Sequence, residues 1–160
     1  MHDPVNVLFV CMGNICRSPT AQAVFQQRLD EAGLTGRVTV DSCGTGEWHV
    51  GKQPDPRAME AGLRRGYDLS SLRARQIEPR DMDRFDYVLT MDSDNQRRVA
   101  ALTSDNAKAR PELFLSYATR HQEEEVPDPY YGDGDGFERV LDLIEDACDG
   151  LIRDIRENRL

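Results

Sequence analysis

The feature that most constrains this chain is a short polar segment between an apolar strand and an amphipathic helix, close to the start of the sequence. Residues 5–10 are apolar and mostly β-branched apart from Asn6, which predicts a buried strand. Ser18 followed by Pro19 is typical of an N-cap and the first residue of a helix. Apolar residues then recur at helical spacing, at Ala21, Phe25, Leu29 and Ala32.

The segment between this strand and helix is suited to binding an anion. Backbone N–H groups of a loop that leads into a helix converge on one point, and the helix dipole favours negative charge there. Gly13 and Asn14 tolerate the positive φ angles of a curled loop, and Arg17 adds a planar cation that matches two phosphate oxygens. The same positive field favours a thiolate. We therefore expect Cys11, at the end of the strand, to be a nucleophile that attacks phosphorus.

Other interpretations of these residues fit the sequence less well. A cysteine after a strand is commonly a small buried hydrophobe. A zinc site needs about four ligands, and Cys11 and Cys16 lack the close paired spacing of common zinc sites. A nucleotide-binding loop would end in Gly-Lys-Ser or Gly-Lys-Thr, which is absent here.

Composition predicts one soluble domain over residues 1–160, large enough for a hydrophobic core. The sequence has neither an apolar run long enough to span a membrane nor a charged-then-apolar leader, so we expect a cytoplasmic protein. The net charge of −9 argues against nucleic acid and anionic membranes as partners. An anion site must therefore be a local positive focus, supplied by Arg17 and the loop dipoles.

Apolar runs alternate with helical patterns along the rest of the chain, which predicts an α/β fold. We expect a four-stranded, parallel, doubly wound sheet flanked by helices on both faces. The four predicted strands cover residues 5–10, 38–41, 85–91 and 113–115. The predicted helices cover residues 19–33, 54–66 and 80–84, then one capped by Ser93 and a last one whose apolar face runs from Phe137 to Ile155. Ligands of such sheets bind beyond the carboxyl ends of the strands, where Cys11 stands.

The motif Cys11-x5-Arg17-Ser18-Pro19, directly after the first strand, resembles the low-molecular-weight protein tyrosine phosphatases, and the resemblance covers nearly the whole chain. It implies an enzyme without metal or cofactor that hydrolyses phosphotyrosine and aryl phosphate monoesters and releases inorganic phosphate. Its partners would be phosphotyrosine proteins or peptides. The resemblance predicts no oligomeric state.

The resemblance also implies roles for the loop. Cys11 would form a phosphocysteine intermediate and Arg17 would stabilise the transition state. Asp92 matches a family residue that orients the arginine, although capping the following helix is an equally good interpretation. The phosphate would be bound by Met12, Gly13, Asn14, Ile15, Cys16 and Ser18.

Asp128 is the candidate general acid, because the leaving oxygen of a phosphate ester needs a proton. It stands between Pro127 and Pro129, and Asp128-Pro129-Tyr130-Tyr131 matches the family's acid loop. In the second step the ionised carboxylate would take a proton from water. The alternative is that Asp128 merely caps a turn.

Aromatic residues are predicted to form the substrate pocket. Trp48, Tyr130 and Tyr131 could make a slot that stacks on a phosphotyrosine ring and is too deep for phosphoserine. The alternative is that Trp48 is a core aromatic. Ile15 adds an apolar wall. In relatives that resemble arginine phosphatases a small Thr occupies its position, so Ile15 favours the tyrosine class.

A supporting network is also implied by the resemblance. Ser18 is close enough in sequence to donate a hydrogen bond to the Cys11 sulfur. The family joins the equivalents of Asn14, Ser18 and Ser42 to a His, at a position we assign to Ser71 here. The shorter serine would leave room for a water and make the loop less rigid.

The other cysteines are assigned by position. Cys43 follows a strand and Cys148 lies on an apolar helix stripe, so both are expected to pack in the core. Cys16 shares the anion loop with Cys11. We expect oxidation of Cys11 to be trapped as a Cys11–Cys16 disulfide, which would protect the nucleophile, and the resemblance supports this.

Two other functions fit parts of the sequence. An arsenate reductase shares this loop and fold but needs two further reactive cysteines, closely spaced in the later part of the chain. Cys43 and Cys148 do not provide that pair. A catalytically inactive phosphate-binding module would be expected to lack Cys11, Arg17 or Asp128, and all three are present.

Overall fold

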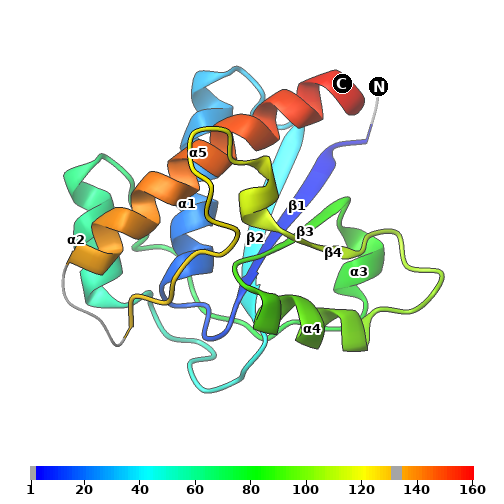
Figure 1. Cartoon of the computed structure of the whole chain (residues 1–160), viewed down its shortest axis with the longest axis horizontal. Coiled ribbons are helices and arrows are strands. Elements are labelled where there is room, and N and C mark those ends of the chain that lie inside the picture. The colour runs from blue at the N-terminus through cyan, green and yellow to red at the C-terminus, as the bar shows by residue number, and fades with distance from the viewer. Residues whose placement is uncertain (1–2, 131–134) are drawn as a thin grey trace.

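The fold is organised around β1 (Val5–Cys11), one of the two inner strands of a parallel sheet. β1 pairs with β2 (Val38–Gly44) on one side and β3 (Tyr87–Thr90) on the other, and β4 (Pro111–Leu113) pairs with β3. The order is β2-β1-β3-β4, as Figure 1 shows. Because all four strands run in the same direction, their carboxyl ends share one edge, and Cys11 lies there.

This computed structural model describes residues 3–130 and 135–160. Its helices are α1 (Arg17–Glu31), α2 (Pro56–Arg64), α3 (Asp81–Arg84), α4 (Ser93–Leu102), the 3₁₀ helix η1 (Phe114–Tyr117) and α5 (Asp135–Asn158). None of the helices within these described ranges is long and apolar enough to cross a membrane.

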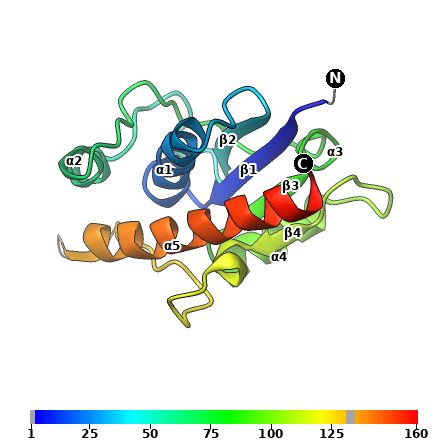
Figure 2. The same cartoon turned by 90° about the horizontal axis from the view of Figure 1, so that it is seen from above.

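Successive side chains of β1 point to opposite sides of the sheet, and on each side the buried ones are apolar. Helices therefore cover both faces. Phe9 belongs to the core formed with α1 and α5, which lie next to each other in both views (Figures 1 and 2). Leu8 and Val10 belong to a second core that contains Met82 of α3 and Val99 of α4. The predicted α/β fold with a four-stranded parallel sheet is therefore confirmed. Cys43 and Cys148 are buried in these cores, as expected.

The start of the first helix differs from the prediction, because the Ser18 hydroxyl is used in the site and not as a cap. α1 begins at Arg17, with Cys16 at the N-cap position. The Ser18 Oγ lies 2.9 Å from the Cys11 Sγ. Pro19 is thus the third helical residue, where a missing N–H removes no helical hydrogen bond.

The sequence offers two caps for α4, Ser93 and Asp92, and the structure uses one of them. Asp92, not Ser93, is the N-cap residue, and its carboxylate and the Asn95 side chain form a reciprocal capping box. The Ser93 hydroxyl is instead bonded to Glu125. The last strand is also shifted. β4 covers Pro111–Leu113, two residues earlier in the chain than the predicted strand at 113–115.

Candidate active site

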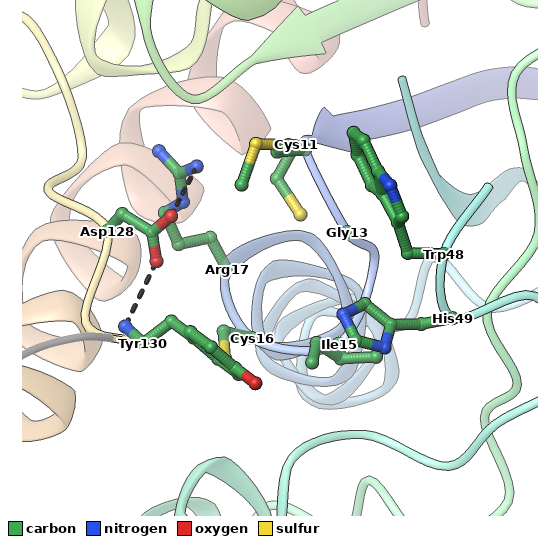
Figure 3. Close-up of a pocket in the computed structure, with 10 residues that line it drawn as sticks. Cys11, Gly13, Ile15, Cys16, Arg17, Trp48, His49, Asp128 and Tyr130 are labelled. Carbon is green, nitrogen blue, oxygen red and sulfur yellow. Dashed lines mark hydrogen bonds and ion pairs between the residues drawn. The ribbon is translucent and has the colours of Figure 1, made fainter. Parts of the chain in front are cut away.

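The loop between β1 and α1 curls around the Cys11 sulfur at the carboxyl edge of the sheet. Asn14 takes the left-handed conformation, with φ of 55°, and its backbone N–H lies 3.3 Å from the Cys11 Sγ. Figure 3 shows the thiol facing the pocket that this loop lines. The pocket has a volume of about 440 Å³ and is lined by Cys11, Met12, Gly13, Ile15, Cys16, Arg17, Trp48, His49, Asp128 and Tyr130.

Two glycines, Gly13 and Gly44, allow the loop to pack closely against neighbouring segments, because a side chain at either position would crowd them. Gly13 was expected to supply a positive φ, but among the described residues it is not one of the glycines that do so. A Cβ on Gly13 would lie 3.0 Å from the His49 ring, so its small size makes room for a pocket wall. A Cβ on Gly44 would lie 2.7 Å from the Met12 carbonyl oxygen, so the end of β2 must be this small for the loop to cross it.

The Cys11 thiol is 2 % exposed and has two hydrogen-bond partners. Ser18 Oγ lies 2.9 Å from its Sγ, and the Asn14 N–H donates to it over 3.3 Å. The Ser18 hydroxyl also lies 3.2 Å from the Cys43 carbonyl oxygen, which can accept its proton instead. Ser18 can therefore donate to Cys11 when the sulfur is ionised, and to Cys43 when the sulfur carries its own proton.

A network of buried hydrogen bonds holds the loop in place. The Asn14 side-chain amide donates to Ser18 Oγ over 2.8 Å and to Ser42 Oγ over 3.0 Å. Its carbonyl oxygen accepts the Arg75 backbone N–H over 3.0 Å. Ser42 in turn donates to Gln22 Oε1 over 2.6 Å. The structure thus brings Asn14, Ser18 and Ser42 together, as the resemblance implies.

Ser71 makes no direct hydrogen bond to this network within the described residues. Its side chain is exposed, in a shallow depression on the α1 side of the molecule that Gln22 also lines. The side chain that bonds directly to Ser42 from α1 is Gln22, and the contribution of Ser71 to the network through a water stays a prediction. Sequence reasoning missed Gln22, whose only signal was its place one turn after Ser18 on the same helix.

Arg17 is buried and held by three groups. Its Nη1 donates to Asp92 Oδ2 over 2.6 Å and to the Val126 carbonyl oxygen over 3.0 Å, and its Nη2 lies 3.6 Å from Asp128 Oδ2. Burial acts to lower the pKa of Arg17, but Cys11 and then Asp92 outweigh burial and raise it. The guanidinium therefore stays charged beside the sulfur.

Asp92 and Asp128 each use their two oxygens for different partners. Asp92 Oδ2 binds Arg17, while its Oδ1 accepts the Asn95 N–H over 2.8 Å, so both predicted roles are present. Asp128 Oδ1 accepts the Tyr130 N–H over 3.0 Å, which is the expected turn. Its Oδ2 faces Arg17 across the pocket (Figure 3), and the side chain is 31 % exposed.

The pocket walls are aromatic. Trp48 is 66 % exposed and lines the pocket, so the alternative that it packs in the core is wrong. Figure 3 shows Trp48 and His49 on one side and Tyr130 on the other, with 6.4 Å between the ring centroids of His49 and Tyr130. Sequence reasoning missed His49, although it follows Trp48 directly. Tyr131 lies outside the described residues.

Cys16 lines the same pocket as Cys11 and is buried. Burial raises the pKa of Cys16, and the negative charges of Asp55 and Cys11 add to this, so Cys16 remains a protonated thiol. The Cys11–Cys16 disulfide stays a prediction. Peptide mapping after mild peroxide should find it, and sulfinic acid at Cys11 without a loop disulfide would reject it.

A buried cysteine beside a charged arginine, in a loop at the carboxyl edge of a parallel sheet, is the arrangement that a cysteine-dependent phosphatase uses. Comparison with known sequences gives the family. The chain belongs to the low molecular weight phosphotyrosine protein phosphatases, whose family model matches residues 6–160.

Individual relatives agree with this assignment. A low molecular weight phosphotyrosine protein phosphatase of Schizosaccharomyces pombe is 47 % identical over 97 % of this chain and 99 % of its own length. The crystal structure of a protein tyrosine phosphatase from Entamoeba histolytica, with Hepes in its active site, is 39 % identical and superimposes with a TM-score of 0.93 over 98 % of this chain and 99 % of its own. That of YfkJ from Bacillus subtilis is 35 % identical, with a TM-score of 0.92 over 99 % of both chains.

Proposed function

We propose that this protein hydrolyses phosphotyrosine in proteins or peptides, with Cys11 as nucleophile, Arg17 as transition-state stabiliser and Asp128 as general acid and base. The observation that carries the proposal is the convergence of these three side chains on one pocket. The sulfur lies at the floor, and Arg17 and Asp128 face each other beside it with 3.6 Å between Nη2 and Oδ2. Both catalytic steps need this arrangement.

In the first step the Cys11 thiolate attacks phosphorus, and the bond between phosphorus and the phenolic oxygen breaks. Asp128, in its protonated form, gives its proton to the leaving oxygen, so that a phenol leaves and not a phenoxide. Arg17 and the loop N–H groups stabilise the charge on the three non-bridging oxygens. The phosphate would lie against the loop formed by Met12, Gly13, Asn14, Ile15, Cys16 and Ser18.

In the second step water attacks the phosphocysteine, and the bond between sulfur and phosphorus breaks. Asp128 is now ionised and takes a proton from that water. The Ser18 hydroxyl, 2.9 Å from Sγ, donates to the returning thiolate and makes it a better leaving group. Inorganic phosphate is released, and Asp128 is protonated again for the next cycle. Every step uses only this chain, the ester and water.

The substrate class follows from the walls. The Trp48 and Tyr130 side chains, on opposite sides of the pocket, suit an aromatic ring carried above a phosphate at the floor. Ile15 keeps the lower wall apolar, which favours a tyrosine over a charged guanidino group. The proposed location is the cytoplasm, where thiols stay reduced and Cys11 would stay active.

Two measurements test the proposal. Peptides of one sequence carrying phosphotyrosine, phosphoserine or phosphoarginine should be hydrolysed with phosphotyrosine clearly preferred. Asp128→Asn should slow phenyl phosphate, which has a poor leaving group, by about 10² to 10⁴-fold and p-nitrophenyl phosphate much less. An equal loss on both esters would remove Asp128 as the acid, and equal rates on the three peptides would overturn the aromatic slot.

A further inference from the structure

The segment that carries Asp128 is held to the body of the protein at separate points. Residues 118–130, all of them described, form neither helix nor strand. The first part is held by the buried Asp146 of α5. Its carboxylate accepts the backbone N–H groups of Thr119, Arg120 and His121, each over 2.9 Å. The last part is held by Glu125 and Val126, shortly before the acid.

Glu125 is exposed, yet it makes a specific contact with the start of α4. Its Oε2 accepts the Ser93 backbone N–H over 2.6 Å and also bonds to the Ser93 hydroxyl. Ser93 is the first residue of α4, where a free N–H and the helix dipole favour a carboxylate. The Ser93 contacts lower the pKa of Glu125, so the carboxylate is ionised. The capping box of this helix is formed by Asp92 and Asn95, without Glu125.

The same turn of chain holds Arg17. Asp92, next to Ser93, binds the guanidinium at 2.6 Å. Val126, next to Glu125, accepts from that guanidinium over 3.0 Å and donates its N–H to the Met91 carbonyl over 2.8 Å. Asp92 and Val126 therefore both accept from Nη1 of Arg17, and the Glu125–Ser93 contact joins the two segments that carry them.

We propose that Glu125 is a positioning residue, which ties the acid-bearing segment to the first turn of α4 and so fixes where Asp128 stands relative to Arg17. The inference rests on the proposed role of Asp128 as general acid. Glu125 touches neither the pocket nor the phosphate loop. Only two residues separate it from Asp128, and a misplacement of about 1 Å is enough to slow a proton transfer strongly. Losing this contact should therefore weaken acid catalysis more than nucleophilic attack.

The test is the dependence of rate on the leaving group. Glu125→Ala should lower kcat for phenyl phosphate about tenfold more than kcat for p-nitrophenyl phosphate, because only the former needs the proton. Glu125→Gln keeps an oxygen that can accept from Ser93 and should recover much of the loss. Ser93→Ala, which removes only the hydroxyl, should give a smaller effect of the same kind. Binding of inorganic phosphate should stay unchanged in all three variants.

Glu124→Ala is the matched control, since this neighbouring carboxylate is exposed and has no hydrogen bond or ion pair within residues 3–130 and 135–160. It should behave as the wild type. An equal loss on both esters in Glu125→Ala, or no loss, would overturn the inference, as would an identical effect of Glu124→Ala. A merely structural role would also weaken phosphate binding.

The two variants distinguish failure of the proposed acid role of Asp128 from failure of the positioning role of Glu125. If Asp128→Asn shows no leaving-group dependence, the acid assignment fails, whatever Glu125 does. If Asp128→Asn shows it and Glu125→Ala does not, only the positioning role fails. In the Asp128→Asn background, Glu125→Ala should add no further leaving-group effect, because both changes act on one proton transfer. A full additional loss there would show that Glu125 acts by another route.

Discussion

The phosphate loop and the acid segment of this protein are built in opposite ways. The loop is continuous in sequence, and its polar groups are satisfied by a buried network that runs from Asn14 to Gln22. The acid segment, residues 118–130, approaches from the other end of the chain and is held through a few contacts, while Asp128 remains partly exposed. The loop groups that would bind the phosphate are therefore held by a continuous buried network. Asp128, the proposed proton donor, is held only through a few contacts of its segment.

This difference has a physical reason. Donors that stabilise a transition state work best when they are already oriented, since they then need no reorganisation during the reaction. A general acid must let the substrate enter and the product leave, and must serve both steps. Holding it by several separate contacts allows such movement while keeping its average place.

The largest effect should come from Cys11→Ser, which removes the nucleophile and leaves the loop. A serine hydroxyl at this place has no base to ionise it, so turnover of p-nitrophenyl phosphate should fall by at least about 10⁴-fold. Inorganic phosphate should still bind within a few-fold of the wild type by calorimetry, because its donors are the loop and Arg17. Cys148→Ala, a thiol removed from the α5 core, should keep the activity. Residual turnover near the wild-type rate would exclude Cys11 as nucleophile.

Gly44→Ala should disturb the phosphate loop without removing any functional group. The new Cβ would lie 2.7 Å from the Met12 carbonyl oxygen and 3.1 Å from the Asn14 nitrogen, so the loop backbone must shift. We expect a loss of about 10² in kcat/KM, with weaker phosphate binding and no added leaving-group dependence. Gly136→Ala is the control, because its Cβ would meet Pro129 of the acid segment, and not the loop, at an ordinary 3.5 Å. Equal losses in both variants would contradict the proposed rigidity of the loop.

The same contrast explains what could be predicted from the sequence. Cys11 and Arg17 belong to one local motif, so their meeting follows from a strand, a short turn and a helix. Ser18 was mistaken for a cap because a cap needs only a hydroxyl oxygen next to the first helical N–H groups. Only tertiary structure shows that this hydroxyl is bonded to Cys11 and Asn14 instead. Gln22 and His49 were missed because each meets its partner in the site across separate segments of the chain. Hydrophobic periodicity shows which face of an element is buried, but not which residue of another segment it contacts.

The acid side was predicted only in part, for a related reason. The resemblance gave Asp128, but the contacts that hold its segment join residues far apart in the chain, such as Glu125 to Ser93. For Asp92 the sequence offered two alternatives, orienting Arg17 or capping α4, and it did not show that the two carboxylate oxygens serve both roles at once. Tethers between distant segments depend on packing, whereas the loop depends mainly on local geometry.

Asp146→Asn tests the tether at the start of the acid segment through stability. Burial acts to raise the pKa of Asp146, but the Thr119 N–H, His121 and the Arg120 N–H outweigh it and lower the pKa to about 2 from 3.8. A folded-state pKa below the unfolded value contributes stability at high pH that is lost as pH falls. At pH 7 the variant should unfold with about 2 kcal/mol less free energy than the wild type.

The pH dependence makes this prediction specific. The difference between wild type and Asp146→Asn should be constant above pH about 4 and should shrink as pH falls from about 4 toward about 2. Urea unfolding at pH 7, 4 and 3 measures it. Asp142→Asn, an exposed carboxylate about one turn earlier on α5 that pairs with Arg65 of another segment, is the control and should change stability less. A difference independent of pH would show that the Asp146 charge does not hold the segment.

The smallest effect should come from Trp48→Ala, which leaves both the loop and the acid segment in place. Trp48 packs over the backbone of its own turn, since a Cβ on Gly46 would lie 1.8 Å from its ring, so the indole stays at the pocket mouth. Losing one aromatic contact should lower kcat/KM for a phosphotyrosine peptide about 2- to 10-fold.

Inorganic phosphate, which does not reach the mouth, should bind unchanged. Val50→Ala, exposed in the same turn but outside the pocket, should have no effect. If phosphate binding fell in step with peptide hydrolysis, Trp48 would be supporting the fixed loop and not the aromatic ring of the substrate.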